Sequence, residues 1–206
     1  LPTETYEDIE GIAALAKKVD HEFYTVPGRV KGKAPMITIS VSCFVPKPFT
    51  AFQWEGQDTL EELVDKQNHL RDCVRGEKHI RYNWHEAKVS RIEAVFARGD
   101  RKLSRALLEA HRMGLKFDGW DEFFDYDKWL EAFRLAGVDP AFYANRDFGL
   151  DEVLPWDVID CGVTKEFFRR EREKAYCSKT TPNCREHCSG CGANRLGGER
   201  TCCPHQ

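Results

Sequence analysis

The strongest hydrophobic feature of the chain is the stretch from Met36 to Trp54, which begins as an apolar run and continues as a loop rich in proline and aromatic residues. The run up to Val45 is rich in β-branched residues and carries small polar residues at alternate positions. This pattern predicts a β-strand that is buried on both sides and ends at the prolines. It fits a strand of a parallel barrel, in which the loop after the strand carries the function. We call the segment from Lys47 to Gln57 the proline loop.

The segment before this strand has apolar residues at helical spacing. Thr5 and Asp8 have the spacing of a capping box, and apolar residues recur at helical intervals after them. A helix is therefore predicted from Tyr6 to Val19. The connector that follows could hold a short edge strand over Glu22 to Val26.

A second helix and a second strand follow the proline loop. Asp58 or Thr59 is expected to cap the helix, and Gly76 is expected to end it. The segment from His79 to His85 is predicted to be a strand, with three apolar side chains on one face (Ile80, Tyr82 and Trp84). The order helix, strand, helix, strand is typical of right-handed parallel crossover units, in a barrel or an open α/β sheet.

The remainder of the chain is predicted to be helical. Helices are expected after a capping box formed by Ser90 and Glu93, after Asp100, from Tyr126 to Ala136, at Asp139–Pro140, and from Lys165 to about Tyr176. The residues expected in its core are Trp120, Trp129, Leu130, Phe133 and Trp156. Two strands are fewer than a barrel or an open sheet needs. We therefore predict the second part of a larger sheet domain (residues 1–115), a helical extension (116–176) and a cysteine-rich tail (177–206).

Composition narrows the class of protein. The chain has 206 residues, of which 41% are hydrophobic and 12% aromatic, so it can bury a sizeable core and is not a disordered protein. No apolar run approaches membrane-spanning length, and the polar start does not resemble a signal peptide. We expect a cytoplasmic protein without membrane contact. The absence of an initiator Met suggests a piece cut from a longer chain.

Charge gives no general attraction to nucleic acid, because the net charge is only -3. Acidic residues predominate from Asp118 to Glu152, and basic residues predominate from Lys165 to Arg200. We interpret these segments as two solvated faces. Nucleic acid is not indicated, since the basic segment lacks an aromatic platform.

Nine cysteines is a high number for this length, and most of them cluster near the end of the chain. Such clustering in a well-cored protein favours a reducing compartment and a metal site over a disulfide framework. The candidate ligands are three closely spaced thiolates and a fourth group: Cys184, Cys188, Cys191 and either Cys202 or Cys203, with His205 or an external ligand as further alternatives. A sulfur-rich site suits zinc or an iron–sulfur cluster. The other interpretation is an unstructured tail with spare thiols.

Several runs resemble one protein family. The opening LPTET, the segment ITISVSCFVPKPFTAFQWEG, the segment LPWDVIDCGVTKEFFRRE and the cysteine-rich tail are similar to the later part of radical S-adenosylmethionine proteins. The nearest resemblance is to the uncharacterised group that carries an N-terminal cobalamin-binding domain, and it covers nearly the whole chain. Ala51 stands where relatives usually have a second proline, which predicts a slightly looser loop.

The resemblance implies the C-terminal part of a partial (β/α)6 barrel of the TIM type. Leu1–Thr5 would be the loop after its fourth strand, Met36–Val45 its fifth strand and His79–His85 its sixth. In the family, a 4Fe-4S cluster in a Cx3CxxC loop after the first strand binds S-adenosylmethionine and cleaves it reductively to a 5′-deoxyadenosyl radical. That cluster and any cobalamin domain would precede Leu1. The missing N-terminal part of the barrel is then the chain's partner, and the chain alone is expected to be an inactive enzyme fragment whose substrate is unknown.

The cysteine tail has the same spacing as the family's catalytic motif, but the barrel must follow that motif and only fifteen residues follow Cys191. An additional site is therefore predicted, and the resemblance favours an iron–sulfur cluster over zinc. The alternative function is a zinc knuckle that binds RNA or a protein partner.

Five side chains are candidates for binding S-adenosylmethionine or substrate: Thr3, Glu4, Ser40, Ser42 and Lys47. The resemblance places the first two near S-adenosylmethionine, after a strand end. The two serines share one strand face, and the lysine lies between two prolines. The plain alternatives are small side chains that relieve crowding in a core and a lysine that is merely solvated.

No catalytic residue is assigned from the sequence. His85 ends the second predicted strand and could act in acid–base chemistry, although a structural role is favoured. Cys43 and Cys161 are interpreted as small, buried apolar residues.

Overall fold

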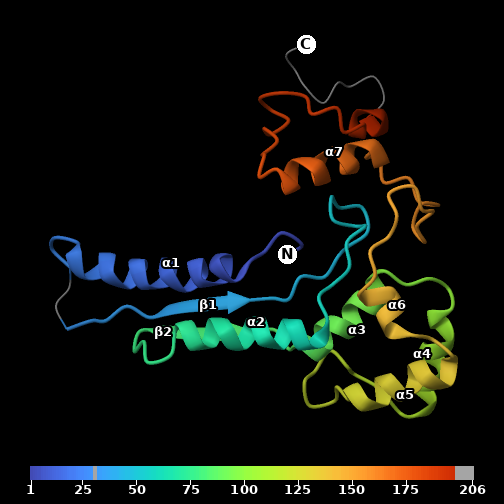
Figure 1. Cartoon of the computed structure of the whole chain (residues 1–206), viewed down its shortest axis with the longest axis horizontal. Helices are drawn as coiled ribbons and strands as arrows, with labels where there is room; N and C mark the ends of the chain where they lie inside the picture. The colour runs from blue at the N-terminus through green and yellow to red at the C-terminus, as the bar shows by residue number, and fades with distance from the viewer. Residues whose placement is uncertain (30–31, 198–206) are drawn as a thin grey trace.

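A computed structural model describes residues 1–29 and 32–197 of the chain. This part is an α/β structure with seven α-helices and one parallel two-stranded sheet (Figure 1). In chain order the elements are α1 (Tyr6–Thr25), β1 (Ile37–Val41), α2 (Leu60–Cys73), β2 (Ile80–Trp84), α3 (Ala87–Ala97), α4 (Leu103–Arg112), α5 (Tyr126–Ala136), α6 (Pro140–Ala144), α7 (Lys165–Tyr176) and the 3-10 helix η1 (Ala193–Gly197).

The two strands run parallel, as the order of elements predicts, with α2 as the crossover between them. Their register pairs Ile37 with Ile80 and Ile39 with Tyr82. Because side chains alternate along a strand, this register places the apolar residues of both strands on the same face.

Helices α1 and α2 cover the apolar face of the sheet. Ile39 joins Ile9, Ala13, Leu70 and Val74 in one buried cluster. Both helices begin with a capping box, in which a threonine hydroxyl accepts from a backbone N–H three residues on and the acidic side chain at that position returns the bond. The predicted starts of these helices are therefore confirmed.

The opposite face of the sheet is uncovered in the described residues, so the prediction of a strand buried on both sides is wrong for this part of the chain. Thr38, Ser40 and Ser42 are exposed on it, beside Arg81 and Asn83 of β2. The expectation failed because helices lie against only one face of the sheet. Small polar side chains alternate with apolar ones for that reason, and β1 is shorter than predicted.

Helices α3 to α6 enclose a second core. Trp129 and Phe133 are buried there, as predicted. The prediction was wrong for Leu130, which is 37% exposed on the outer side of α5, and for Trp120, which is 64% exposed in the turn before it. Leu115 belongs to the same core, which therefore draws on residues from both sides of the predicted domain boundary at residues 115/116.

Two boundaries differ from the prediction. Helix α1 continues to Thr25, so the segment predicted as an edge strand is helical. Helix α3 begins at Ala87, and the predicted capping box does not form, because the Ser90 hydroxyl hydrogen-bonds His85 instead of the start of a helix.

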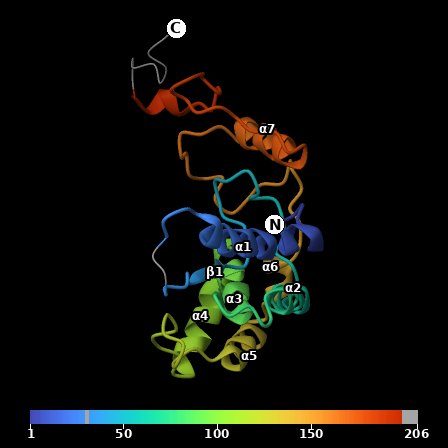
Figure 2. The ribbon, with the colours of Figure 1, turned by 90° about the vertical axis from the view of Figure 1, so that its left-hand side faces the viewer.

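The proline loop packs against the segment that follows α6. Trp54 is buried against Phe148, Leu154 and Trp156 in a third cluster. Figures 1 and 2 both place α7 and the segment that follows it, up to Gly197, at the opposite end of the molecule from α4 and α5, with the proline loop between them. No helix in the described part of the chain has the length and hydrophobicity needed to cross a lipid bilayer.

Candidate functional site

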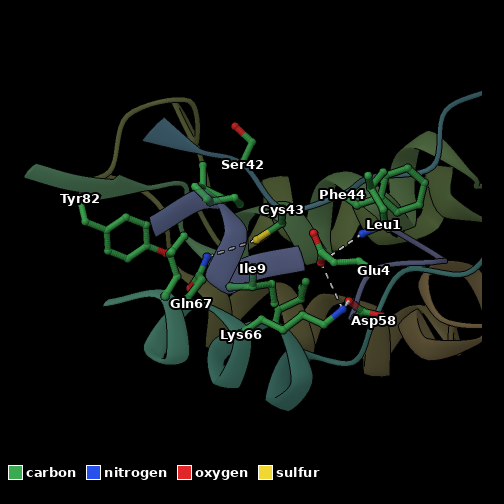
Figure 3. A pocket seen from close by; sticks show the side chains of 14 residues that line it. Leu1, Glu4, Ile9, Ser42, Cys43, Phe44, Asp58, Lys66, Gln67 and Tyr82 are labelled. Carbon is green, nitrogen blue, oxygen red and sulfur yellow. Dashed lines mark hydrogen bonds and ion pairs between the residues drawn. The ribbon is translucent and has the colours of Figure 1, made fainter. Parts of the chain in front are cut away.

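A pocket of about 340 Å³ lies at the carboxyl end of β1, between α1 and α2 (Figure 3). Apolar side chains supply most of its wall, including Ile9, Ile12, Leu63 and Leu70. In parallel α/β folds this end of the strands is where ligands bind. The pocket is therefore the leading candidate for a binding site in the described part of the chain.

One side of the pocket carries a cluster of charges. The Lys66 ammonium lies 2.8 Å from an Asp58 carboxylate oxygen and 3.4 Å from Glu4. Burial acts to lower the pKa of Lys66, but the hydrogen bond and charge of Asp58, with help from Glu4, raise it above its ordinary value. Glu4 thus has a structural partner and is held at the pocket by it.

A thiol lies opposite these charges. Cys43 receives a hydrogen bond from the Gln67 amide at 3.3 Å, and its own S–H points to the backbone oxygen of His85 at 3.8 Å. Burial raises the pKa of the Cys43 thiol above its ordinary value, and the Glu86 charge adds to this, so the thiol is protonated at neutral pH. The prediction of a buried apolar residue is therefore corrected: Cys43 is half-buried and hydrogen-bonded.

Ser90 hydrogen-bonds an imidazole near this thiol. Its hydroxyl oxygen lies 2.7 Å from Nδ1 of His85, and its interaction with Cys43 acts to lower the pKa of the thiol against the larger effect of burial. Ser90 is almost fully buried, whereas His85 lies at the surface. The three side chains come from the ends of β1 and β2 and from the first turn of α3, so the parallel pairing brings them together.

The candidates predicted from the sequence do not all converge. Glu4 and Ser42 line the pocket, although the Ser42 hydroxyl points away from it in Figure 3. Ser40 lies on the uncovered face of the sheet, and Thr3 is exposed in the turn before α1. Lys47 forms an ion pair with Glu93 of α3, so it is not merely solvated.

The polar contacts that hold α7 were not predicted from the sequence. Glu55 of the proline loop is only 5% exposed, and it accepts hydrogen bonds from Arg172 and, at 2.8 Å, from the Tyr176 hydroxyl. Nearby, the Trp156 indole donates to the Gln53 side chain at 2.7 Å. These contacts fix α7, and the tail that follows it, to the loop at the carboxyl end of β1.

The tail folds back on α7 as far as the structure describes it. The Cys191 carbonyl accepts from the Thr164 N–H at 2.9 Å, at the start of α7. Gly192 has a φ of +94°, and a Cβ there would lie 2.7 Å from the Thr164 methyl carbon, so only glycine fits this close approach. Cys161, predicted as buried, is half-buried beside this contact.

Three of the predicted metal ligands, Cys184, Cys188 and Cys191, lie in the described part of the chain. Within residues 1–29 and 32–197, no three His, Cys, Asp or Glu side chains lie close enough together to hold a metal ion. Cys184 is exposed, whereas Cys188 and Cys191 are partly buried. Cys202, Cys203 and His205 lie outside the described residues, so the four-ligand site stays a prediction.

Comparison with known proteins gives one relative. The chain is 33% identical over 107 residues to uncharacterized protein MJ0966 of Methanocaldococcus jannaschii. The match covers 52% of this chain but only 21% of that protein's length. No protein-family model matches the chain. No solved structure matches it either.

Proposed function

We propose that this chain is the C-terminal part of a radical S-adenosylmethionine enzyme, of the uncharacterised group with an N-terminal cobalamin-binding domain. The two parallel strands would be the last two strands of a partial (β/α)6 barrel. The remaining strands, the catalytic 4Fe-4S cluster and any cobalamin domain would belong to the longer polypeptide. The enzyme would be cytoplasmic, and this chain alone would be inactive.

The observation that carries this proposal is the asymmetry of the sheet. Helices α1 and α2 cover its apolar face, whereas Thr38, Ser40, Arg81 and Asn83 stand exposed on the other. A barrel has this arrangement, with helices outside and the opposite face directed inward. An inward face with hydroxyl, amide and guanidinium groups suits a polar cofactor better than a packed apolar interior.

The residues present fit the cofactors only in part. The described part of the chain gathers no set of thiolates that could hold the catalytic cluster. When bound, S-adenosylmethionine would supply the 5′-deoxyadenosyl radical. This chain would contribute polar groups on the inner face, with Ser40 and Ser42 as candidates for hydrogen bonds to it or to the substrate. Glu4, Thr3 and Lys47 would lie at the rim.

The tail would carry an additional metal site rather than the catalytic one. The contacts of Glu55 with α7 hold the start of the tail near the carboxyl end of β1. A metal bound by Cys184, Cys188 and Cys191, with Cys202 or Cys203 as a fourth ligand, would order a segment that has few apolar residues to bury. We favour an iron–sulfur cluster over zinc on the resemblance of the tail to that of the family.

Metal analysis after anaerobic purification tests the proposed tail site. We expect iron, sulfide and a brown absorption spectrum, all lost in Cys188→Ala and retained in Cys177→Ala, an exposed cysteine outside the predicted ligand set. A colourless protein with stoichiometric zinc would support the zinc-knuckle alternative, which would bind RNA or a protein partner. Unchanged metal content in Cys188→Ala would exclude both sites.

A further inference from the structure

Three aromatic side chains are exposed in the segment that joins α4 to α5. We call residues Phe117–Phe123 the aromatic turn. Its rings belong to Phe117, Trp120 and Phe123, which are 69%, 64% and 52% exposed. Since a whole aromatic side chain has an area of about 150–250 Å², these rings present roughly 300–450 Å² of apolar surface. An exposed apolar patch of this size is often an interaction site.

The backbone fixes the aromatic turn in one conformation. The Trp120 N–H donates to the Phe117 carbonyl, and the Phe123 N–H donates to the Trp120 carbonyl, both at 2.9 Å. The rings of Phe117 and Phe123 are in contact, with centroids 5.9 Å apart. Phe117 has a φ of +64°, in the left-handed region that favours glycine, and such strain is typical of functional positions. Rings that are already held in place lose little freedom on binding, which suits them as anchors of an interface.

Negative charge flanks the aromatic turn. Residues 116–128 hold five carboxylates and two lysines, a net charge of -3. Asp125 pairs with Lys128 at 3.3 Å. The other four carboxylates form no ion pair within the described part of the chain: Asp118, Asp121, Glu122 and Asp127. Such a surface repels nucleic acid and anionic lipid, and it attracts a cationic protein surface.

A cationic surface lies at the other end of the same chain. We call residues 177–197 together with Arg170 the basic surface, because the Arg170 guanidinium donates to the Ser189 and Gly190 carbonyls at 3.3 Å. It holds one carboxylate, that of Glu186, and four exposed cations, a net charge of +3. The cations form no ion pair with any carboxylate of the described residues: Arg170, Lys179, Arg185 and Arg195.

The two surfaces cannot meet within one molecule. Figures 1 and 2 both place α7 and the segment that follows it at the opposite end from α4 and α5, between which the aromatic turn lies. Their opposite charges can be matched only between two molecules. Arginine also suits the aromatic turn, because a guanidinium group binds to the face of a tryptophan ring.

We propose that the aromatic turn of one copy of this chain docks on the basic surface of a second copy. The Trp120 ring receives an arginine guanidinium on its face, and the flanking carboxylates pair with the other cations. Because the two surfaces are different, the contact is head-to-tail and can continue into open chains. The aromatic area is about half of the roughly 800 Å² that each partner buries in a stable interface, so the association is weak and reversible.

Sedimentation velocity of this chain tests the proposal, with a reductant present so that exposed cysteines do not cross-link. The protein would be studied from about 1 μM to about 1 mM, a range that covers weak association. We expect the sedimentation coefficient to rise with concentration, and to rise less at high salt. Trp120→Ala should weaken association by about tenfold or more, as the loss of an aromatic anchor does. Leu15→Ala is the matched control, since Leu15 of α1 is also 64% exposed, and it should change nothing.

An exchange of charges separates head-to-tail docking from any other self-association. The double variant Asp121→Lys, Glu122→Lys reverses charge beside the aromatic turn, and Lys179→Glu, Arg185→Glu reverses charge on the basic surface. All four positions are exposed, so the fold should be kept. Each double variant alone should be monomeric. Their mixture should associate, because the intact basic surface of the first meets the intact aromatic turn of the second.

Three results would overturn the proposal, whatever the outcome for the radical function. They are a wild-type chain that stays monomeric at every concentration, a Trp120→Ala variant that associates as wild type does, and a mixture of the two double variants that stays monomeric. The first result would leave the aromatic turn to a partner other than a second copy.

Discussion

Replacing Glu55 should detach α7 from the rest of the fold. This carboxylate is 5% exposed and accepts hydrogen bonds from Arg172 and Tyr176, both on α7. Helix α7 has no fully buried residue of its own, so apolar packing contributes less to its attachment than it does for the other long helices. Glu55→Ala therefore removes the buried polar attachment of α7, leaves the exposed or half-buried contacts of Lys165 and Arg169 with residues 150–157, and does not touch either strand or the second core.

The size of the effect follows from these two contacts. A hydrogen bond to a charged group contributes about 1.5–3 kcal/mol, and a buried charge that loses its partner costs about 3–5 kcal/mol. Arg172 is 27% exposed and can regain water, which reduces the cost. We therefore expect Glu55→Ala to lower the free energy of unfolding by about 3 kcal/mol. Glu55→Gln keeps one acceptor oxygen and should cost about half as much.

Two measurements check this expectation. Urea unfolding gives the change in free energy, and amide hydrogen exchange shows whether the loss is concentrated in α7. Exchange should accelerate from Lys165 to Tyr176 and stay unchanged in α5, which packs in the second core.

The matched control is Glu93→Gln, which breaks the exposed ion pair with Lys47 and should change stability by less than about 1 kcal/mol. The reasoning fails if Glu55→Ala is no more destabilising than Glu93→Gln, or if exchange in α7 does not change.

Two further predictions concern the contacts around the proline loop. A Cβ at Gly56 would lie 2.2 Å from the backbone oxygen of Asn145, so Gly56→Ala should lower the free energy of unfolding in urea by about 1–3 kcal/mol. The control is Gly11→Ala, in open space within α1, which should leave stability unchanged or raise it. Equal effects of the two substitutions would refute the close approach at Gly56. The paired hydrogen bonds of Arg146 hold the pKa of Glu152 below its ordinary value of 4.5, so this contribution to stability is complete above pH 4.5 and is lost as the pH falls through the lowered pKa. Glu152→Gln should flatten stability against pH in that acidic range, and an unchanged slope would show that the ion pair does not form in solution.

The limits of a helix were predicted well where a single capping residue sets its start. Helices α5 and α7 have the predicted limits, since Asp125 and Thr164 each cap the backbone as their side chains allow. The start of α3 was missed because Glu86 makes no capping hydrogen bond and offers no signal. Ser90 has the spacing of a capping residue, but tertiary packing directs its hydroxyl to His85.

The site was harder to predict because its residues meet only through the fold. Glu55 and Arg172 are 117 positions apart, and nothing near either residue indicates the other. Cys43 has the sequence context of an ordinary strand residue, and its contact with the His85 backbone depends on β2 lying parallel to β1. The alternation of small polar residues in β1 did signal a distinct face, but whether helices cover that face cannot be read from the strand alone.

The most direct test of the proposed function is the reductive cleavage of S-adenosylmethionine, measured as 5′-deoxyadenosine by chromatography. A longer polypeptide, which contains this chain and the proposed N-terminal part of the barrel, would be reconstituted anaerobically with iron and sulfide and then reduced. This chain would be treated in the same way for comparison. We expect 5′-deoxyadenosine from the longer polypeptide and none from this chain. A longer polypeptide that leaves S-adenosylmethionine intact, or cleavage by this chain alone, would contradict the proposal.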